Sequence, residues 1–216
     1  MKTISYLVLL LVMSSCCRSK LIDTIKFTPD ELSVNPYTGN EELVFVDNNG
    51  NTVTYGNGHR KINTMEIDKC KGGCCDYYMV ESSNITIFES EYLKSNLQIG
   101  ISHDFDQYSG VRGTPTIHFR WDYYEIEPYV TGTSFGSGDL LQSGLPVDSM
   151  KEKGIEYGIF RDSLILRQRK FYEVFTLPGI CPYPDRLKGD TLFFTKSQGI
   201  IGLKFSDGNL WVRTAD

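Results

Sequence analysis

Leu97-Gln98-Ile99-Gly100-Ile101-Ser102-His103-Asp104-Phe105 alternates between apolar and polar residues along its length. A period of two is typical of a β-strand that buries one face. A second stretch, residues 117–123, alternates in the same way, and a Gly-containing segment separates the two, so they are predicted to form a hairpin. After Tyr123 the apolar positions change parity, which indicates a β-bulge.

Further hairpins are expected on both sides of this pair. Asn49-Gly50 and Asp207-Gly208 are dipeptides that favour two-residue turns of type I′. Pairing outward from the first turn would place Val46 opposite Val53 on the core face. Another hairpin is expected around Gln168-Arg169, between two apolar runs.

The predicted fold is therefore mainly β, a single antiparallel curved sheet that resembles a half-barrel or barrel, with a β-sandwich as the alternative. One or two short helices are expected. The first is predicted at Thr28-Pro29-Asp30-Glu31, which carries a capping box with Pro in the first turn. Residues 131–154 are rich in Gly and lack a clear period, so a binding loop or lid is expected there.

The N-terminal segment predicts export. Lys2 precedes an apolar run of about ten residues, which is too short to cross a bilayer, since a spanning helix needs about 20 residues. Ser14 and Ser15 follow, directly before Cys16. Small residues before a cysteine at a cleavage point resemble the lipobox of bacterial lipoproteins, which implies acylation of Cys16. The alternative is an ordinary secretory signal cleaved nearby.

These features divide the chain into three parts. Residues 1–15 are predicted to be a signal peptide, 16–27 a lipidated N-terminus and tether, and 28–216 a single β-rich domain. The expected location is the bacterial cell envelope, lipid-anchored, on the outer membrane facing the periplasm. The net charge of −5 argues against a nucleic-acid partner, which would require a basic face.

The C-terminal residues carry a resemblance. Phe194-Thr195-Lys196, Gly199-Ile200-Ile201-Gly202-Leu203, Asp207-Gly208 and Trp211 follow one another in that order, and Arg169-Lys170-Phe171-Tyr172-Glu173-Val174-Phe175 precedes them. Together with the lipobox, this pattern resembles small lipoproteins of the Bacteroidota cell envelope. The resemblance covers roughly the last fifty residues and implies location and β architecture, but no activity.

Four cysteines lie in the exported part of the chain: Cys70, Cys74, Cys75 and Cys181. An even number of cysteines in an oxidising space favours disulfides. Cys70 is expected to pair with Cys74 or Cys75 across Gly72-Gly73, and the remaining thiol with Cys181. The alternatives are a zinc or copper site formed by the first three cysteines and His59, or free thiols; we expect no metal and no cofactor.

Candidate catalytic residues are few. His103 and His118 lie on adjacent predicted strands, with Asp104 and Asp122 nearby, and together they would form an acid–base cluster. The sequence contains no Gly-x-Ser-x-Gly elbow, phosphate-binding loop or His-Glu-x-x-His motif. An envelope hydrolase or metalloenzyme built on the histidines is therefore the alternative function.

The leading hypothesis is a membrane-anchored module without enzymatic activity that binds a ligand or supports an envelope assembly. Aromatic residues on the predicted strand faces motivate it, because a curled sheet would present Trp121, Tyr123 and Tyr129 on a concave face. The expected partners are the membrane, through the lipid anchor, and an apolar ligand, a carbohydrate or an envelope protein.

Overall fold

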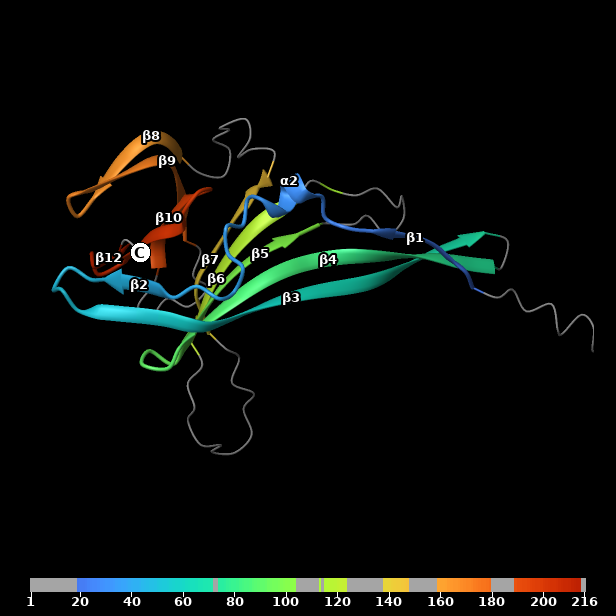
Figure 1. Cartoon of the computed structure of the whole chain (residues 1–216), viewed down its shortest axis with the longest axis horizontal. Helices are drawn as coiled ribbons and strands as arrows, with labels where there is room; N and C mark the ends of the chain where they lie inside the picture. Colours follow the sequence, from blue (N-terminus) through green and yellow to red (C-terminus); the bar gives the residue numbers. More distant parts are fainter. Residues whose placement is uncertain are drawn as a thin grey trace, which may run out of the picture.

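The computed structural model describes residues 19–71, 74–103, 113, 115–123, 138–147, 159–179 and 189–214, with the side chains of 70–75, 123 and 138–142 excepted. Twelve strands form one curled sheet (Figure 1). Eleven of them follow the order β7-β6-β5-β4-β3-β2-β12-β11-β10-β9-β8 and pair antiparallel, while β1 pairs parallel with β4. The predicted half-barrel class is confirmed.

The strands are β1 (Leu21–Ile25), β2 (Leu43–Val46), β3 (Thr52–Lys71), β4 (Cys74–Ser90), β5 (Ser95–Ser102), β6 (Thr116–Tyr123), β7 (Gly138–Pro146), β8 (Ile159–Leu166), β9 (Arg169–Pro178), β10 (Gly189–Thr195), β11 (Gly199–Phe205) and β12 (Leu210–Arg213). A single turn of helix, α2 (Pro29–Leu32), has the predicted capping box between Thr28 and Glu31. No helix in the described part of the chain is long and apolar enough to cross a membrane.

The hairpin of β5 and β6 forms as the alternation predicts. Ile99 lies opposite Phe119 and Leu97 opposite Trp121, and all four side chains are buried. The parity change expected after Tyr123 falls outside the described residues, and the slip in the pairing of β6 with β7 adds its extra residue on β7, between Asp139 and Leu141. β7 itself corrects the sequence prediction, because residues 138–146 form a strand inside the segment expected to be irregular. The glycines of β7 interrupt the apolar–polar alternation by which a strand is recognised, and the strand forms through its pairing with β6.

The turns at Asn49-Gly50 and Asp207-Gly208 are longer than predicted. Gly50 has φ +87° and its N–H bonds to the carbonyl of Asp47, whose own N–H bonds to Asn51. Asp47 also accepts hydrogen bonds from the side chain and backbone of Asn51, which hold the pKa of its carboxyl below the ordinary value. The turn is therefore a three-residue loop that ends in a bulge at a left-handed glycine, and the second turn has the same pattern.

The extra residue in each loop shifts the strand register of the β2–β3 and β11–β12 hairpins by one residue from that of a two-residue turn. The prediction placed Val46 opposite Val53, but Phe45 occupies that position. Because side chains alternate between faces, a shift of one exchanges the inward and outward sets. Leu43 and Phe45 are consequently fully buried. In the last hairpin Leu203 faces Trp211.

β3 is one continuous strand, although Gly56-Asn57-Gly58 has the composition of a loop. Asn57 has φ 48°, and a Cβ on Gly58 would lie 2.2 Å from the carbonyl oxygen of Gly39. The backbone therefore passes very close to the preceding loop. The strand accommodates this with a register shift rather than by ending, which is the geometry of a β-bulge.

The concave side of the sheet is filled by side chains. The indole N–H of Trp121 donates to the hydroxyl of Tyr55 at 2.8 Å, and that hydroxyl lies 3.0 Å from Ser95 Oγ. Trp121 also packs edge-on against Phe205 and Trp211. β7, at one edge of the sheet, lies close to β9 and β10 near the other edge. The curl therefore encloses a packed aromatic core.

Candidate functional site

A cleft of about 410 Å³ opens where the N-terminal loop meets the last strand. Its walls come from four separate parts of the chain: the segment before β2, the start of β9, the turn between β10 and β11, and the end of β12. The lining residues are Pro36, Tyr37, Glu41, Arg169, Ser197, Gln198, Arg213 and Thr214. Charged and polar groups dominate this set.

Tyr37 holds the two sides of the cleft together. Its hydroxyl accepts the backbone N–H of Ile200 at 2.7 Å and donates to the carbonyl of Gln198 at 3.4 Å. Gly199, between them, has φ +76°, and a Cβ there would lie 2.1 Å from the Tyr37 hydroxyl. Burial raises the pKa of Tyr37 to about 12, although the nearby Arg213 acts in the opposite direction. The tyrosine therefore remains a neutral structural group at ordinary pH.

Arg213 and Arg169 supply two cations to the cleft. The Arg213 guanidinium donates to the carbonyl of Gln198 and lies 5.8 Å from the ring centroid of Tyr37. Arg169 donates to the backbone carbonyl of Arg213 and lies 5.1 Å from the ring centroid of Phe171. Packing on aromatic faces and bonds to carbonyls fix both guanidiniums, so little ordering remains for a ligand to impose.

Glu41 supplies the anion of the cleft. Its carboxylate accepts hydrogen bonds from the N–H of Thr38 at 2.8 Å, the Thr38 hydroxyl at 2.7 Å and the N–H of Gly39 at 2.8 Å. Burial alone would raise the pKa of Glu41, but these hydrogen bonds outweigh it and lower the pKa. The cleft thus contains a fixed carboxylate and two fixed guanidiniums, with the hydroxyls of Ser197 and Thr214. This set suits a small ligand that carries both a carboxylate and hydroxyl groups.

The sequence analysis missed this cleft. Tyr37 and Glu41 lie in a segment without periodicity, and Arg213 is one cation on a short final strand. The available signal was Gly199, directly after a polar turn, because a glycine there indicates a backbone conformation or close approach that another residue would not tolerate. Which side chain approaches Gly199 becomes visible only in three dimensions.

The predicted histidine cluster is divided between the two faces of the sheet. His103 is buried on the core side and stacks on Phe27 with ring centroids 4.3 Å apart. His118 is exposed on the opposite face, where its Nε2 lies 2.6 Å from Ser102 Oγ. Asp104 lies outside the described residues. The two histidines therefore do not form one site.

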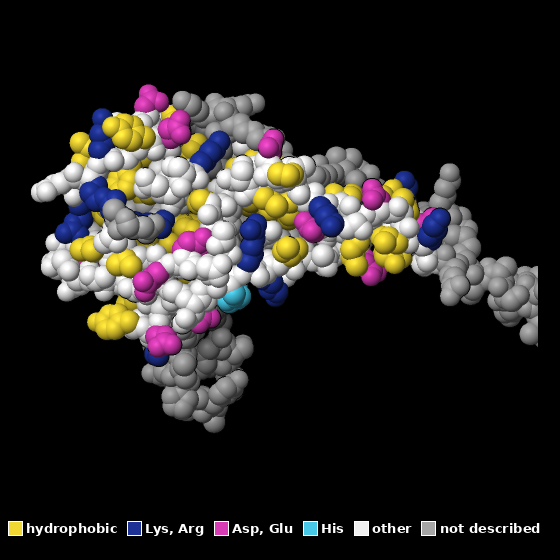
Figure 2. Space-filling model, in the orientation of Figure 1, with side chains coloured by type: hydrophobic (Ala, Val, Ile, Leu, Met, Phe, Trp, Pro, Cys, Tyr) yellow, Lys and Arg dark blue, Asp and Glu magenta, His cyan; other side chains and the backbone are white. Residues whose placement is uncertain are grey.

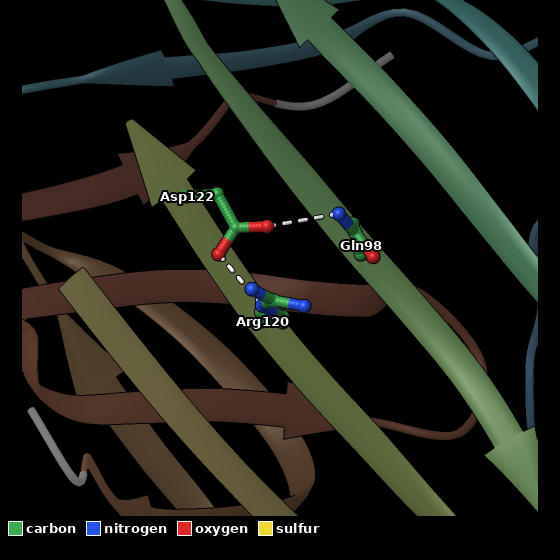
Figure 3. Close-up of polar contacts among 3 residues, drawn as sticks. All are labelled: Gln98, Arg120 and Asp122. Carbon is green, nitrogen blue, oxygen red and sulfur yellow. Dashed lines mark hydrogen bonds and ion pairs between the residues drawn. The ribbon is translucent and has the colours of Figure 1, made fainter. Parts of the chain in front are cut away.

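Asp122 belongs to a polar group on the outer face (Figure 3). Its carboxylate accepts from Arg120 Nε at 2.7 Å and from Gln98 Nε2 at 2.9 Å. The Asp122 side chain is 6% exposed and that of Arg120 42% exposed. The ion pair joins two residues of β6, and the hydrogen bond from Gln98 of β5 links the pair to the neighbouring strand, so the group stabilises the sheet.

The predicted ligand face does not form around Trp121. This side chain is 1% exposed and belongs to the packed core. The side chain of Tyr123 and all of Tyr129 lie outside the described part of the structure. The hypothesis of an aromatic concave surface therefore has no described residue exposed to a ligand.

For Cys70, Cys74 and Cys75 the structure describes the backbone but not the side chains. The β3–β4 register puts Cys70 opposite Cys75 and Lys71 opposite Cys74. Their side chains, and Cys16 and Cys181 altogether, lie outside the description. Among the described residues no group of His, Cys, Asp or Glu side chains could hold a metal ion.

A second cleft, of about 460 Å³, lies on the far side of Glu41. Its lining residues are Asn40, Glu41, Glu42, Thr52, Thr54, Gly56, Asn57, Glu89, Glu91 and Tyr92. Four carboxylates and no cation line it, so it is the acidic counterpart of the arginine-lined cleft. Glu41 lines both clefts and lies between the arginines of the first and the other carboxylates of the second.

No protein-family model, no curated protein and no solved structure matches this chain.

Proposed function

We propose that the protein is a lipid-anchored binding module of the cell envelope, of the Bacteroidota lipoprotein type, acylated at Cys16 and attached to the outer membrane on its periplasmic side. Its ligand is a small acidic carbohydrate, bound in the cleft of Arg169, Arg213 and Glu41. A carbohydrate is the ligand class expected from the sequence, and an acidic one is chosen because Arg169 and Arg213 line the cleft.

The anchor is supported by the N-terminal apolar segment and by the position of Lys20 in the fold. Ser14, Ser15 and Cys16 follow an apolar run of the length typical of export signals. Residue 20 is hydrogen-bonded to Asp76 and Tyr77, at the projecting end of the β3–β4 hairpin and away from the cleft. Acylation at Cys16 therefore leaves the cleft free to face the aqueous space.

The binding role rests on one observation, the pair of immobilised guanidiniums in a single polar cleft. Arginine binds a carboxylate through two parallel hydrogen bonds, and ion-assisted bonds of this kind are about twice as strong as neutral ones. Because Glu41 stays ionised, it would accept hydrogen bonds from sugar hydroxyls on the other side of the ligand. A neutral sugar would lose the arginine contacts.

The anchor is tested by fractionation and intact-mass analysis of the full chain and of Cys16→Ser. The parent should be found in membranes with the mass of an N-terminal cysteine carrying acyl chains, since two or more chains are needed for stable attachment. Cys16→Ser should be exported and released. Membrane retention of Cys16→Ser equal to that of the parent would contradict the anchor.

Binding is tested with the released Cys16→Ser protein, galacturonate as the probe and galactose as its neutral counterpart. Calorimetry should detect galacturonate more strongly than galactose, and Arg169→Gln should abolish the difference. Arg161→Gln, an exposed arginine on β8, is the matched control and should bind as the parent does. Equal binding of the two sugars would rule out the acidic specificity.

A second candidate function is hydrolysis at Ser102 and His118. The 2.6 Å contact between Ser102 Oγ and His118 Nε2 is the distance at which an imidazole activates a hydroxyl. The released protein would then cleave p-nitrophenyl acetate, and both Ser102→Ala and His118→Asn would remove the activity. Activity retained in both variants would exclude this pair as the catalyst.

Cys70 and Cys75 are proposed to form a disulfide in the oxidising space. The register that places Cys70 opposite Cys75 supports a bridge between these two, because directly opposed Cα atoms on antiparallel strands lie about 4.5–5.5 Å apart, within the disulfide range. A bridge from Cys74 to Cys181 is not proposed, because Cys74 lies at the far end of the β3–β4 hairpin, whereas Gly179, two residues before Cys181, is hydrogen-bonded to Asp190 of the body.

A further inference from the structure

The outer part of the β3–β4 hairpin projects from the body as an arm, formed by residues 63–71 of β3, residues 74–83 of β4 and all of β1 (Figure 1). We infer that the tip of this arm docks on a phospholipid bilayer and holds the body away from it. The inference rests on the proposed lipid anchor and adds a surface that contacts the membrane.

The arm begins where β5 stops. Ser83 of β4 pairs with Ser102 at the end of β5, and β4 has no further pairing with that strand toward its own N-terminal end. From Asn63 to Lys71, β3 advances about 3.4 Å per residue, so the arm is about 30 Å long. This length is enough to separate the body from a surface that the tip touches.

The direction of β1 places the N-terminal side of the chain at the tip. β1 runs parallel to β4, which leads from the tip toward the body, and Leu21 lies beside Tyr77. The N–H of Tyr77 bonds to the carbonyl of Lys20 at 3.0 Å, and the N–H of Lys20 lies 3.3 Å from Asp76 Oδ1. The chain is therefore fixed to the tip from residue 20 onward.

The distance from the anchor to the tip is short. Ser19 is the third residue after Cys16, and an extended chain covers at most about 11 Å over those three steps. Acyl chains on Cys16 would therefore hold the tip within roughly the thickness of a headgroup layer. The cleft residues, which lie on the body at the other end of the arm, are therefore held away from the bilayer surface.

The surface of the tip fits the membrane interface. Leu21 and Ile22 are exposed at 43% and 44%, and the half-buried Tyr77 and Tyr78 lie next to them. Tyrosines favour the level of the headgroups, and Lys69, whose Nζ lies 5.8 Å from the ring centroid of Tyr78, can extend its charge to the phosphates. Figure 2 shows hydrophobic side chains along the arm among both kinds of charge.

Apolar and aromatic contacts, rather than net charge, should dominate the docking. The arm carries five carboxylates and two lysines, so its net charge is negative and anionic lipid does not attract it. These residues are Asp23, Glu66, Asp68, Asp76 and Glu81, with Lys69 and Lys71. Large exposed hydrophobics also occur on the body, including Ile165 at 65% and Tyr172 at 63%. The short connection to Cys16 brings the tip, and not these residues, to the bilayer.

The test uses the full-length acylated protein in vesicles of phosphatidylethanolamine and phosphatidylglycerol that contain brominated lipid. Both native tryptophans are buried, Trp121 at 1% and Trp211 at 7%, and they provide an unquenched background. Tyr77→Trp reports on the tip. Tyr172→Trp, an exposed tyrosine of β9, is the matched control on the body.

Emission of the tryptophan at 77 should be lost in brominated vesicles, while emission of the tryptophan at 172 is retained. If the protein floats with the vesicles but neither probe is quenched, the docking is overturned and the anchor stands. Absence of acyl chains by mass would overturn the anchor and the docking together. Tyr78→Trp is the second probe of the tip, should Tyr77→Trp lose the near-ultraviolet circular dichroism of the folded core.

Discussion

The phenolic oxygen of Tyr37 accepts the backbone N–H of Ile200 at 2.7 Å, and so joins the loop before β2 to the start of β11 across 163 residues of sequence. Replacing Tyr37 with Phe would leave that buried N–H without its partner. An unsatisfied buried donor costs about 1–3 kcal/mol, so we expect Tyr37→Phe to lower the free energy of unfolding by this amount in urea titrations. Tyr172→Phe, at an exposed tyrosine, should leave it unchanged.

The same tyrosine predicts a pH dependence of stability. Its pKa is about 12 in the fold against 10.0 ordinarily, so the neutral form is favoured by folding. The contribution is fully present below pH 10 and is lost as pH rises to about 12, by roughly 3 kcal/mol in total. Unfolding measured from pH 8 to pH 12 should show this fall in the parent and a smaller one in Tyr37→Phe. Parallel curves for the two proteins would contradict it.

Gly199 should tolerate no side chain. Its φ of +76° disfavours any other residue, and an added Cβ would lie 2.1 Å from the Tyr37 hydroxyl and 2.2 Å from Cζ. Strain and overpacking together predict that Gly199→Ala costs about 3 kcal/mol or more. Gly208→Ala is the matched control, because Gly208 has φ +85° but no atom within 4 Å, so only about 1–2 kcal/mol is expected. Equal losses would show that the contact with Tyr37 is unimportant.

The sheet could be predicted from the sequence because its signals are local. The alternation over 97–105 and 117–123 identifies two strands and their buried faces, and the buried side chains of Leu97 and Trp121 confirm it. Register was harder, because Asn49-Gly50 is compatible with a two-residue or a three-residue loop. The hydrogen bonds of Asp47 and Asn51 select the longer loop.

The cleft could not be predicted because it depends on contacts remote in sequence. Arg213, Gln198 and Tyr37 meet only after β2, β11 and β12 have assembled. The histidines illustrate the opposite case, since proximity on adjacent strands suggested a cluster. His103 continues the inward face of β5, whereas His118 lies opposite Gly100 on the outward face. Strand parity, rather than sequence distance, separates them.

The β8–β9 turn offers a stabilising substitution. The sequence predicted the turn at Gln168-Arg169, but Leu166 pairs with Arg169, so Arg167 and Gln168 form it with φ of 46° and 71°. These are the conformations of a type I′ turn, which glycine adopts without strain. We expect Gln168→Gly to raise the free energy of unfolding by about 1 kcal/mol, as measured in urea. Arg167 is unsuitable for the same change, because its side chain donates to the carbonyl of Val46 at 2.9 Å.

The cysteines of the arm provide a last prediction, which separates the pairings left open by the sequence. If Cys70 and Cys75 are bridged, as their opposed positions favour, proteolysis without reductant should release them as one linked fragment, in which Cys74 is a free thiol. Cys75→Ser would then expose one additional thiol, at Cys70. A fragment that links Cys70 to Cys74 would instead require the strands to slip by one residue near the tip, and would contradict the register of β3 and β4. Alkylation before and after reduction, read by mass, distinguishes these outcomes.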